Sequence, residues 1–493
     1  MRIRGSAVRS ALAALPITLA LSSCVDEKTV FEERDLFGTP PSAAAGFLGY
    51  VDSQTKLVAC GSCHVGQQAE WKQTAHAGAW ETLQNSGFAQ PVCSGCHTVN
   101  ERGNLTDQTA GYLAVPDVRY HDVQCESCHG PGLTHIRNPD VEANQPLAPV
   151  SVGADLTTGC GECHQGAHHP FVEEWEQSPH GHVIASPAGR AGCDGCHEGK
   201  GALRAWGVDD NYLEKGTTGL IPIVCAVCHD PHGSENNAQL RFPIETASID
   251  EHLCARCHNR RVVPDPSSSH GLEPHAPQAA LLAGEAGWFP PGLEIVPGEI
   301  QATHGTERNT GLCATCHVQD VTVTDASGGF LVHSTGHLFR SIPCVDASGV
   351  PLPGDCGLST SARSFGACAT SGCHASPSAA FSVLTTATSR LLNLSEELHD
   401  LLVLVDPNLT EAGGEIDPAN PTFTTAEGAF FNLALAEFPE RDRPDARLLF
   451  AGSAAHNPFL MEQLLLASID VVEATYGVSA SPSLARQRVL TAR

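Results

Sequence analysis

Residues 125–129 read Cys-Glu-Ser-Cys-His, and the pattern of two cysteines separated by two residues and followed at once by histidine recurs along the chain. Two thiols at this spacing lie on one turn and can reach both vinyl groups of one porphyrin, and the adjacent imidazole then becomes the proximal iron ligand. Zinc knuckles or exported disulfides would not require a histidine after every pair. The pattern therefore predicts covalently attached haem c. Its eight copies are Cys60, Cys63 and His64; Cys93, Cys96 and His97; Cys125, Cys128 and His129; Cys160, Cys163 and His164; Cys193, Cys196 and His197; Cys225, Cys228 and His229; Cys254, Cys257 and His258; and Cys313, Cys316 and His317.

A longer variant of the motif, with four residues between the cysteines, follows the eighth copy. It consists of Cys368, Cys373 and His374. We expect a ninth haem here, because a longer loop can still present both thiols to one porphyrin. A disulfide with Cys344 or Cys356 is the alternative, and it would leave eight haems. With a ninth haem, Cys344 and Cys356 can pair with each other, and Cys24 completes the 21 cysteines of the chain.

The N-terminus has the features of an exported protein. Basic residues precede an apolar run over residues 11–21, which is typical of a secretory signal and is too short for a permanent membrane span. Leu-Ser-Ser-Cys at residues 21–24 resembles the bacterial lipobox, in which the cysteine becomes the lipidated first residue. We therefore expect removal of residues 1–23 and anchoring to a lipid bilayer through Cys24. An ordinary signal peptide with an incidental cysteine is the alternative. Val25 after the cysteine favours the outer membrane, facing the periplasm or the cell surface.

The composition excludes some classes of function. The 28 Lys and Arg against 55 Asp and Glu give a net charge of -27, which argues against a nucleic-acid-binding surface because such a surface is basic. An acidic surface suits a cationic protein partner or hydrated metal ions. Only 5% of the residues are aromatic, so few large side chains are present to fill a core in a chain of 493 residues. Something other than aromatic residues is expected to fill it.

The motifs are periodic and indicate a duplication. The first three motifs begin at residues 60, 93 and 125, and the next three begin at 160, 193 and 225, so that the triplet is displaced by 100 residues. A second pattern, W-x-x-[ST]-x-H, follows the first and the fourth motif. Its two copies are Trp71-x-x-Thr74-x-His76 and Trp175-x-x-Ser178-x-His180. A duplicated three-haem module is the simplest account of these matches.

On these residues the chain resembles the multihaem c-type cytochromes of the superfamily that includes tetrathionate reductases, hydroxylamine oxidoreductases, ammonia-forming nitrite reductases and related electron-transfer cytochromes. The resemblance rests on the C-x-x-C-H repeats, the two W-x-x-[ST]-x-H segments and the sequence around Cys125, and it covers residues 59–375. Two features depart from the enzymes. The chain has no C-x-x-C-K motif, which marks the catalytic haem of the nitrite reductases, and its number of haems fits no single enzyme type.

We expect a mainly α-helical fold with extensive loops, in which a haem-organised cytochrome array is followed by a C-terminal helical bundle. Apolar residues recur at helical spacing in 380–405, 424–438 and 458–476, and Asn457 and Pro458 are typical of the start of a helix. The expected segments are a lipoprotein signal peptide (1–23), a linker (24–58), a three-haem module (59–159), its duplicate with the seventh haem (160–262), haems eight and nine with Pro/Gly-rich insertions (263–380) and a haem-free helical region (381–493).

Composition also limits the sixth iron ligands. Met461 is the only methionine after the signal peptide, so nearly all haems should have two histidine ligands and low potential, or an open position. Nine proximal histidines leave 16 of the 25 for this role. His399, in an apolar helical run, could also reach a haem. The candidate distal ligands are His76, His180, His135 and His232, followed by His121, His169, His275, His304 and His337. In the second group His168 competes with His169, His270 with His275 and His333 with His337, and a solvated histidine is the alternative.

Three functions fit these features. The first is electron transfer along closely spaced haems at the outer membrane or cell surface, in respiratory exchange with other cytochromes, an outer-membrane conduit or extracellular metal acceptors. The second is a multihaem reductase or oxidase of a small nitrogen or sulfur oxyanion, with Arg119–His121 or Arg260–Arg261 near an open haem. The third is a subunit of a polymeric extracellular cytochrome filament, which a lipid anchor argues against. Whether the chain is an enzyme stays open, and electron transfer is the preferred prediction.

Overall fold

The computed structural model describes residues 37–149, 159–208, 219–246, 248–268, 271–306, 308–370, 372–411, 423–437, 451–484 and 486–487. The chain divides into two compact units, Met1–Thr39 and Pro40–Arg493, and the second unit contains all nine motifs. The expected signal peptide, Cys24 and the first part of the expected linker lie outside the described residues. Their roles stay predictions.

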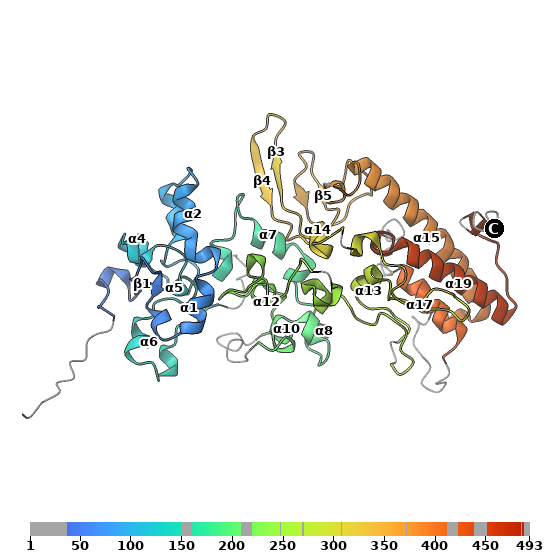
Figure 1. Ribbon diagram of the computed structural model, residues 1–493, viewed down its shortest axis with the longest axis horizontal. Coiled ribbons are helices and arrows are strands. Elements are labelled where there is room, and N and C mark those ends of the chain that lie inside the picture. Colours follow the sequence, from blue (N-terminus) through green and yellow to red (C-terminus); the bar gives the residue numbers. More distant parts are fainter. Residues whose placement is uncertain are drawn as a thin grey trace, which may run out of the picture. The chain divides into compact units, whose positions relative to one another are not determined.

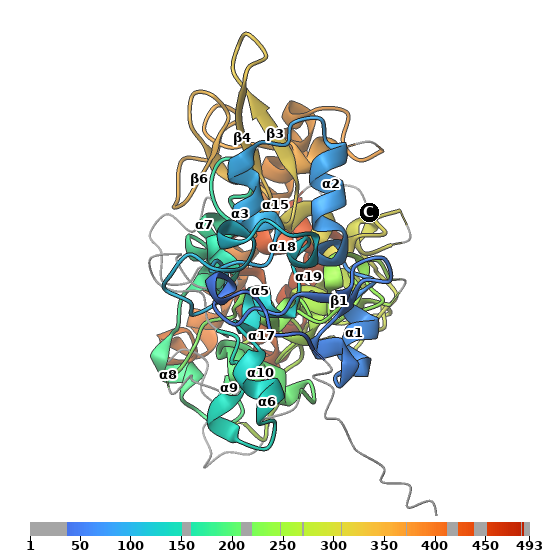
Figure 2. The ribbon, with the colours of Figure 1, turned by 90° about the vertical axis from the view of Figure 1, so that its left-hand side faces the viewer.

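Short helices and loops make up the region of the first five motifs (Figure 1). The helices are α1 (Val65–Trp71), α2 (Ala79–Asn85), α3 (Ser94–His97), α4 (Gly111–Ala114), α5 (Cys125–His129), α6 (Leu133–Arg137), α7 (Phe171–Glu176), α8 (Ala185–Ala188), α9 (Asp194–His197) and α10 (Gly199–Ala205), and the strands are β1 (Tyr50–Asp52) and β2 (Leu57–Val58). Helices α9 and α10 lie side by side (Figure 2). Several helices coincide with the motifs themselves, because one turn suffices to present two thiols.

The region of the remaining motifs contains fewer helices and two small hairpins. Its elements are α12 (Cys225–Cys228), α13 (Gln278–Ala283), α14 (Leu312–His317), β3 (Val321–Thr324), β4 (Phe330–Ser334), β5 (Cys344–Val345) and β6 (Pro351–Leu352). Strands β3 and β4 pair antiparallel, with Val321 opposite Ser334 (Figure 2). Strand β5 pairs antiparallel with β6. The disulfide between Cys344 and Cys356 closes the second hairpin and confirms the predicted pairing.

The C-terminal region forms a helical bundle, as the apolar spacing predicts (Figure 1). Its helices are α15 (Pro377–Val405), α16 (Pro407–Glu411), α17 (Thr425–Glu437), α18 (Ala451–His456) and α19 (Pro458–Tyr476). Asn457 caps α19 by accepting a hydrogen bond from the Leu460 N–H at 3.1 Å, and Gly477 ends the helix in the left-handed conformation. Among the described residues, no helix is both long and apolar enough to cross a membrane.

Apolar packing differs between the two regions. The bundle has one large core in which buried leucines of α15 contact Phe430 and Phe431 of α17 and Ile469 of α19, and α13 joins it through Leu281. The motif region has only small clusters, such as the one around Trp71 or the one around Trp175. The structure thus confirms a mainly helical fold with extensive loops and a C-terminal bundle. The motif region lacks a large apolar core among its described residues.

Candidate haem-binding sites

The cysteines of the nine motifs are all unpaired in the described structure, and they number eighteen. In the regular motifs the backbone closes a turn, so that the His64 N–H donates to the Cys60 carbonyl and the His164 N–H donates to the Cys160 carbonyl, both at 2.9 Å. The longer motif closes in the same way, because the His374 N–H donates to the Cys368 carbonyl at 3.0 Å. The two extra residues therefore widen the loop from four to six residues, and the histidine N–H still bonds to the carbonyl of the first cysteine.

Histidine rings face each other in pairs, and each pair joins one motif histidine to a histidine from elsewhere in the chain. The separations of ring centroids are 6.5 Å for His64–His135, 6.3 Å for His129–His232, 6.1 Å for His164–His76, 5.8 Å for His197–His275, 6.4 Å for His229–His337, 6.2 Å for His258–His180, 6.3 Å for His317–His456 and 6.2 Å for His374–His304. Eight of the nine motif histidines thus face a second imidazole.

These separations fit one metal ion between two imidazoles. Two metal–nitrogen bonds of about 2.0–2.1 Å, together with about 1.2 Å from each nitrogen to its ring centre, place the centroids about 6.4 Å apart. Stacked aromatic rings in direct contact would lie closer, as His121 and Trp80 do at 4.0 Å. The gap between the paired rings and the unpaired thiols beside them are what a haem c with two axial histidines requires.

The ring nitrogens are arranged for the same chemistry. Nδ1 of His229 lies 2.7 Å from the Ala238 carbonyl, and Nδ1 of His317 lies 3.0 Å from the Phe339 carbonyl. Because a carbonyl oxygen only accepts hydrogen bonds, Nδ1 carries the proton in each case, and Nε2 keeps the lone pair that binds a metal. Burial lowers the pKa of His180 to about 4 and that of His456 to about 3, which favours the neutral imidazole that can act as a ligand.

The W-x-x-[ST]-x-H segment of the first module builds a compact support for its histidine. The Thr74 hydroxyl donates to the Trp71 carbonyl at 2.7 Å and tightens the end of α1. The Trp71 indole N–H donates to the Val123 carbonyl at 2.9 Å, and the Val123 N–H donates to the His76 carbonyl at 3.1 Å. The segment before the third motif is therefore tied to both ends of this pattern, and His76 is held where it faces His164.

The second module repeats these bonds one for one. The Ser178 hydroxyl donates to the Trp175 carbonyl at 2.7 Å, and the Trp175 indole N–H donates to the Ile223 carbonyl at 2.8 Å. The Ile223 N–H donates to the His180 carbonyl at 3.1 Å. The spacing of the pattern thus has a physical reason, which is that the tryptophan and the histidine hold the same backbone segment.

The histidine pairs cross the expected boundary between the modules. Two of them, His76–His164 and His129–His232, join a residue of 59–159 to a residue of 160–262. The same arrangement recurs one repeat later in His180–His258 and His229–His337. Each module therefore supplies histidines to the other.

One motif histidine has no such partner ring. Among the ring contacts of the described residues, His97 has none with a second histidine, and its Nδ1 lies 2.9 Å from the Ala79 carbonyl. His169 lies within electrostatic reach of His97. The pKa of His169 is lowered, chiefly by burial and then by the neighbouring His168 and His97. His121, the other candidate near this site, contacts Trp80 and Tyr112 instead.

Sequence reasoning missed His456, which lies at the end of α18 in the region expected to be free of haem. No motif surrounds it, and only the surplus of histidines over proximal positions allowed for such a residue. His399, which the sequence suggested instead, lies on α15 with a side chain that is 49% exposed, next to Asp400. Met461 packs in the apolar core of the bundle.

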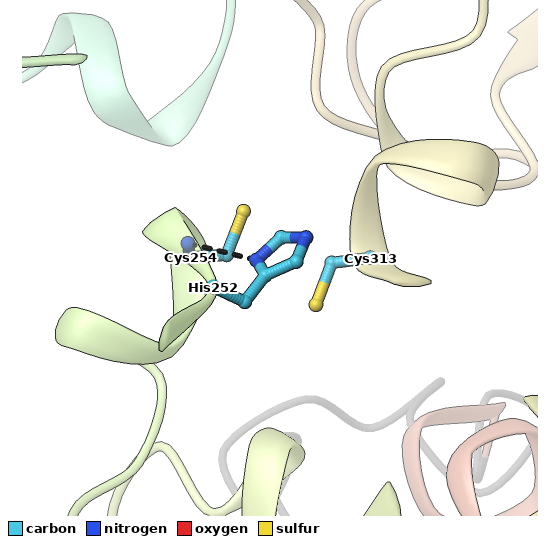
Figure 3. A group of neighbouring side chains, drawn as sticks. All are labelled: His252, Cys254 and Cys313. Carbon is cyan, nitrogen blue, oxygen red and sulfur yellow. Dashed lines mark hydrogen bonds between the residues drawn. The ribbon is translucent and has the colours of Figure 1, made fainter. Parts of the chain in front are cut away.

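A further buried histidine lies between two motifs. His252 is fully buried, its Nδ1 accepts a hydrogen bond from the Cys254 N–H at 3.1 Å, and possible ligand atoms of His252, Cys254 and Cys313 lie within 4.8 Å of one another (Figure 3). Both thiols belong to motifs and are expected to bond to porphyrins, so we do not assign a separate metal site to them. Instead the cluster brings the seventh and eighth motifs together.

Thiols of different motifs meet at several places in the array. Those in hydrogen-bonding contact are Cys60 with Cys125, Cys96 with Cys163, Cys160 with Cys225, Cys196 with Cys257 and Cys254 with Cys313. Those within electrostatic reach are Cys128 with Cys160, Cys228 with Cys254 and Cys316 with Cys368. Every motif takes part in at least one of these contacts.

Known proteins share parts of this arrangement. The family described as cytochrome c554 and c-prime matches residues 59–130, and a doubled CXXCH motif matches residues 223–262. The multiheme cytochrome MtrA of Shewanella baltica is 27% identical over 186 residues, which cover 34% of this chain and 51% of that protein. Cytochrome c-554 of Nitrosomonas europaea is 34% identical over 91 residues, which cover 15% of this chain and 36% of that protein.

The chain thus spans about half and about a third of the length of these two relatives. No solved structure matches it significantly. The motifs, the geometry around them and these similarities make the chain a multihaem c-type cytochrome, and its cofactor is haem c.

Proposed function

We propose that the chain transfers electrons along nine haem c groups, each held between two histidines. The observation that carries this proposal is the set of eight facing histidine pairs, whose separations leave room for one iron and close both of its axial positions. A haem c with two histidine ligands exchanges one electron reversibly at low potential. An iron with both positions filled does not bind a substrate.

The ninth pair in this proposal is His97 with His169. The duplication supports it, because His197 and His275 form the corresponding pair one repeat later. His97 and His197 are 100 residues apart, and His169 and His275 are 106 residues apart. The carbonyl of Ala79 holds His97 by its Nδ1, as carbonyls hold His229 and His317.

The thiol contacts support a continuous path. Because each motif thiol bonds to the edge of its own porphyrin, thiols in contact bring two porphyrin edges together. The contacts join the sites in the order first, third, fourth, sixth, seventh, eighth and ninth. Three of these links are electrostatic neighbourhoods rather than hydrogen-bonding contacts, and they join Cys128 with Cys160, Cys228 with Cys254 and Cys316 with Cys368. The second site adjoins the fourth and the fifth adjoins the seventh, so both are side branches.

The proposed location and partners are supported by the N-terminus and by the relatives. The lipobox-like residues 21–24 favour an exported protein anchored to the outer membrane through Cys24. The similarity to a multiheme cytochrome favours exchange of electrons with other cytochromes. An outer-membrane electron conduit in respiration is part of the same proposal. The net charge of -27 suits a cationic partner surface or hydrated metal ions as acceptors.

A second candidate function is the reduction or oxidation of a small nitrogen or sulfur oxyanion. One observation favours it: among the described residues the ring of His97 is faced by no second histidine ring, so this site is where a sixth position would stay open. An open haem would need neighbouring groups that deliver protons, and His121 beside Trp80 lies in this part of the chain.

Electron paramagnetic resonance of the oxidised protein, combined with haem quantitation, separates the two functions. Electron transfer predicts nine haems, all low-spin, and reversible voltammetric signals that nitrite, hydroxylamine and tetrathionate leave unchanged. A high-spin signal equivalent to one haem, together with a catalytic current with one of these compounds, would favour the enzyme. A count of eight haems would remove the site of Cys368 and Cys373.

A further inference from the structure

We propose that the C-terminal bundle belongs to the redox array: His456 supplies the sixth iron ligand at the eighth motif, and residues 455–457 fix the last two sites. The inference rests on the proposed function, because it requires haem at Cys313 and Cys316. It assigns a role to a region that contains no attachment motif.

His456 lies where an axial ligand must lie. Its ring faces that of His317 at 6.3 Å with an angle of 21° between the ring planes, which is close to parallel. Nδ1 of His456 is buried and makes no hydrogen bond within the described part of the chain. Nδ1 of the opposite His317 is turned toward the Phe339 carbonyl at 3.0 Å. The two rings therefore have the same separation as the pairs built from motif-region histidines alone, such as 6.3 Å for His129–His232 and 6.4 Å for His229–His337.

The preceding residue contacts the ninth site. The Ala455 carbonyl accepts a hydrogen bond from Nδ1 of His304 at 2.7 Å, and the His304 ring faces His374 at 6.2 Å. A carbonyl at Nδ1 fixes the tautomer and the orientation of a ligating imidazole. Ala455 and His456 thus act on two neighbouring sites, the ninth and the eighth.

The following residue holds the segment in place. Asn457 is fully buried, and its side-chain amide donates to the Leu281 carbonyl at 2.9 Å and to the Ile300 carbonyl at 2.8 Å. Its Oδ1 atom accepts the Leu460 N–H and caps α19. One side chain therefore connects α13, the loop at Ile300 and α19. On the other side, the Ser453 hydroxyl donates to the Leu435 carbonyl of α17 at 2.8 Å.

This anchoring explains why a large apolar core lies beside the last two sites. A ligand on a short helix would otherwise be free to move away from the iron, since α18 has only six residues. The bundle core, with helices α15, α17 and α19, keeps α18 in position. The bundle thus determines whether the eighth iron has one protein ligand or two.

Replacement of His456 tests the proposal in the full-length holoprotein. His456→Ala should convert one low-spin haem of the nine to high-spin in the ferric protein, and one haem should bind carbon monoxide after reduction. The matched control is His399→Ala, which removes a half-exposed histidine from α15 of the same bundle and should leave the spectra unchanged. His456→Met should stay low-spin and raise the midpoint potential of one haem, because methionine ligation raises the potential.

The outcomes separate the ligand role from folding and from the proposed function. An all-low-spin His456→Ala protein that binds no carbon monoxide would overturn the proposal. If the alanine variant does not fold, a methionine variant without a shifted potential overturns it equally. A wild-type protein that lacks haem at the eighth motif would instead refute the proposed function.

Asn457→Ser separates anchoring from capping. Serine can still cap α19, but it loses both donations to Leu281 and Ile300. We expect partial high-spin character at two haems, the eighth and the ninth, while the helix content in circular dichroism stays unchanged. A variant with wild-type spectra would show that the segment is held without these bonds and would overturn the anchoring role.

Discussion

The two modules, residues 59–159 and 160–262, differ in how they position two kinds of histidine. The histidine of the W-x-x-[ST]-x-H segment is positioned by the same hydrogen bonds in both modules, and the histidine that faces the third motif is positioned by different contacts. The shared part is the W-x-x-[ST]-x-H support, in which the indole and the histidine backbone bind the segment before a motif. The difference lies in the loop that carries the histidine facing the third motif of each module. That loop ends at His232 for the first module and at His337 for the second.

In the first module, backbone packing determines the position of the loop. Gly233, next to His232, has φ +123°, and a Cβ atom there would lie 2.8 Å from the Glu70 carbonyl of α1. Only glycine fits such an approach without strain. The side chain of Glu70 is exposed and takes no part.

In the second module, a buried carboxylate determines the position of the loop. Glu174 occupies in α7 the position of Glu70 in α1, one residue before the tryptophan. Its carboxylate accepts the Thr335 N–H at 3.1 Å, the Thr335 hydroxyl at 2.9 Å and the His337 N–H at 2.8 Å. The two modules thus reach the same facing pair by different local means. Haem binding constrains the separation of the two imidazoles. It does not constrain which contacts hold the loop that carries the second imidazole, so these contacts can differ between the modules.

The largest expected effect tests the shared part. His76→Ala and His180→Ala should each convert one haem of the nine to high-spin, because each removes a ring that faces a motif histidine at 6.1 Å or 6.2 Å. The amplitude of the high-spin signal should be equal in the two variants. Electron paramagnetic resonance of the ferric proteins measures it. A signal from only one variant would show that the two supports are not equivalent.

A smaller effect should expose the difference. Glu174→Gln places an amide N–H₂ among hydrogen-bond donors and weakens three bonds to a charged acceptor. We therefore expect the free energy of unfolding to fall by about 2–3 kcal/mol. We also expect partial high-spin character at one haem. Glu70→Gln is the matched control and should change neither property. Denaturant unfolding followed by circular dichroism and the ferric spectrum measure both. Equal responses of the two variants would contradict the assigned role of Glu174.

The motif turns and the bundle were predictable because their signals are local, and haem attachment at each motif stays a prediction. Two thiols and a histidine within one turn define a haem c motif, and apolar residues at helical spacing define α15, α17 and α19. The repeated tryptophan pattern also marked His76 and His180. The structure places both opposite a motif histidine, and their role as ligands stays a prediction.

The pairing itself could not be predicted, because it is a tertiary property. His76 faces His164 rather than a histidine of its own module, and no local pattern encodes a contact over 88 residues. His456 lies in an apolar helical region where a buried structural histidine is equally common. Likewise α13 lies in a Pro/Gly-rich connection, yet its apolar residues enter the core of the bundle. In these cases packing against segments that are distant in the sequence determines the position of the residue.

The smallest effect concerns the two indoles. Trp71→Phe and Trp175→Phe keep most of the buried ring but remove the N–H that binds Val123 or Ile223, at 2.9 Å and 2.8 Å. Each should lower the free energy of unfolding by about 1–2 kcal/mol, since a partly buried carbonyl loses its donor. Every haem should stay low-spin, because the Val123 and Ile223 N–H groups still bind the histidine carbonyls. Paired unfolding curves check this. Equal losses would mean that the duplicated support is equivalent in energy as well as in geometry. A loss confined to Trp175 would mean that the second module depends on its α7 helix for both histidines, through the indole and through Glu174.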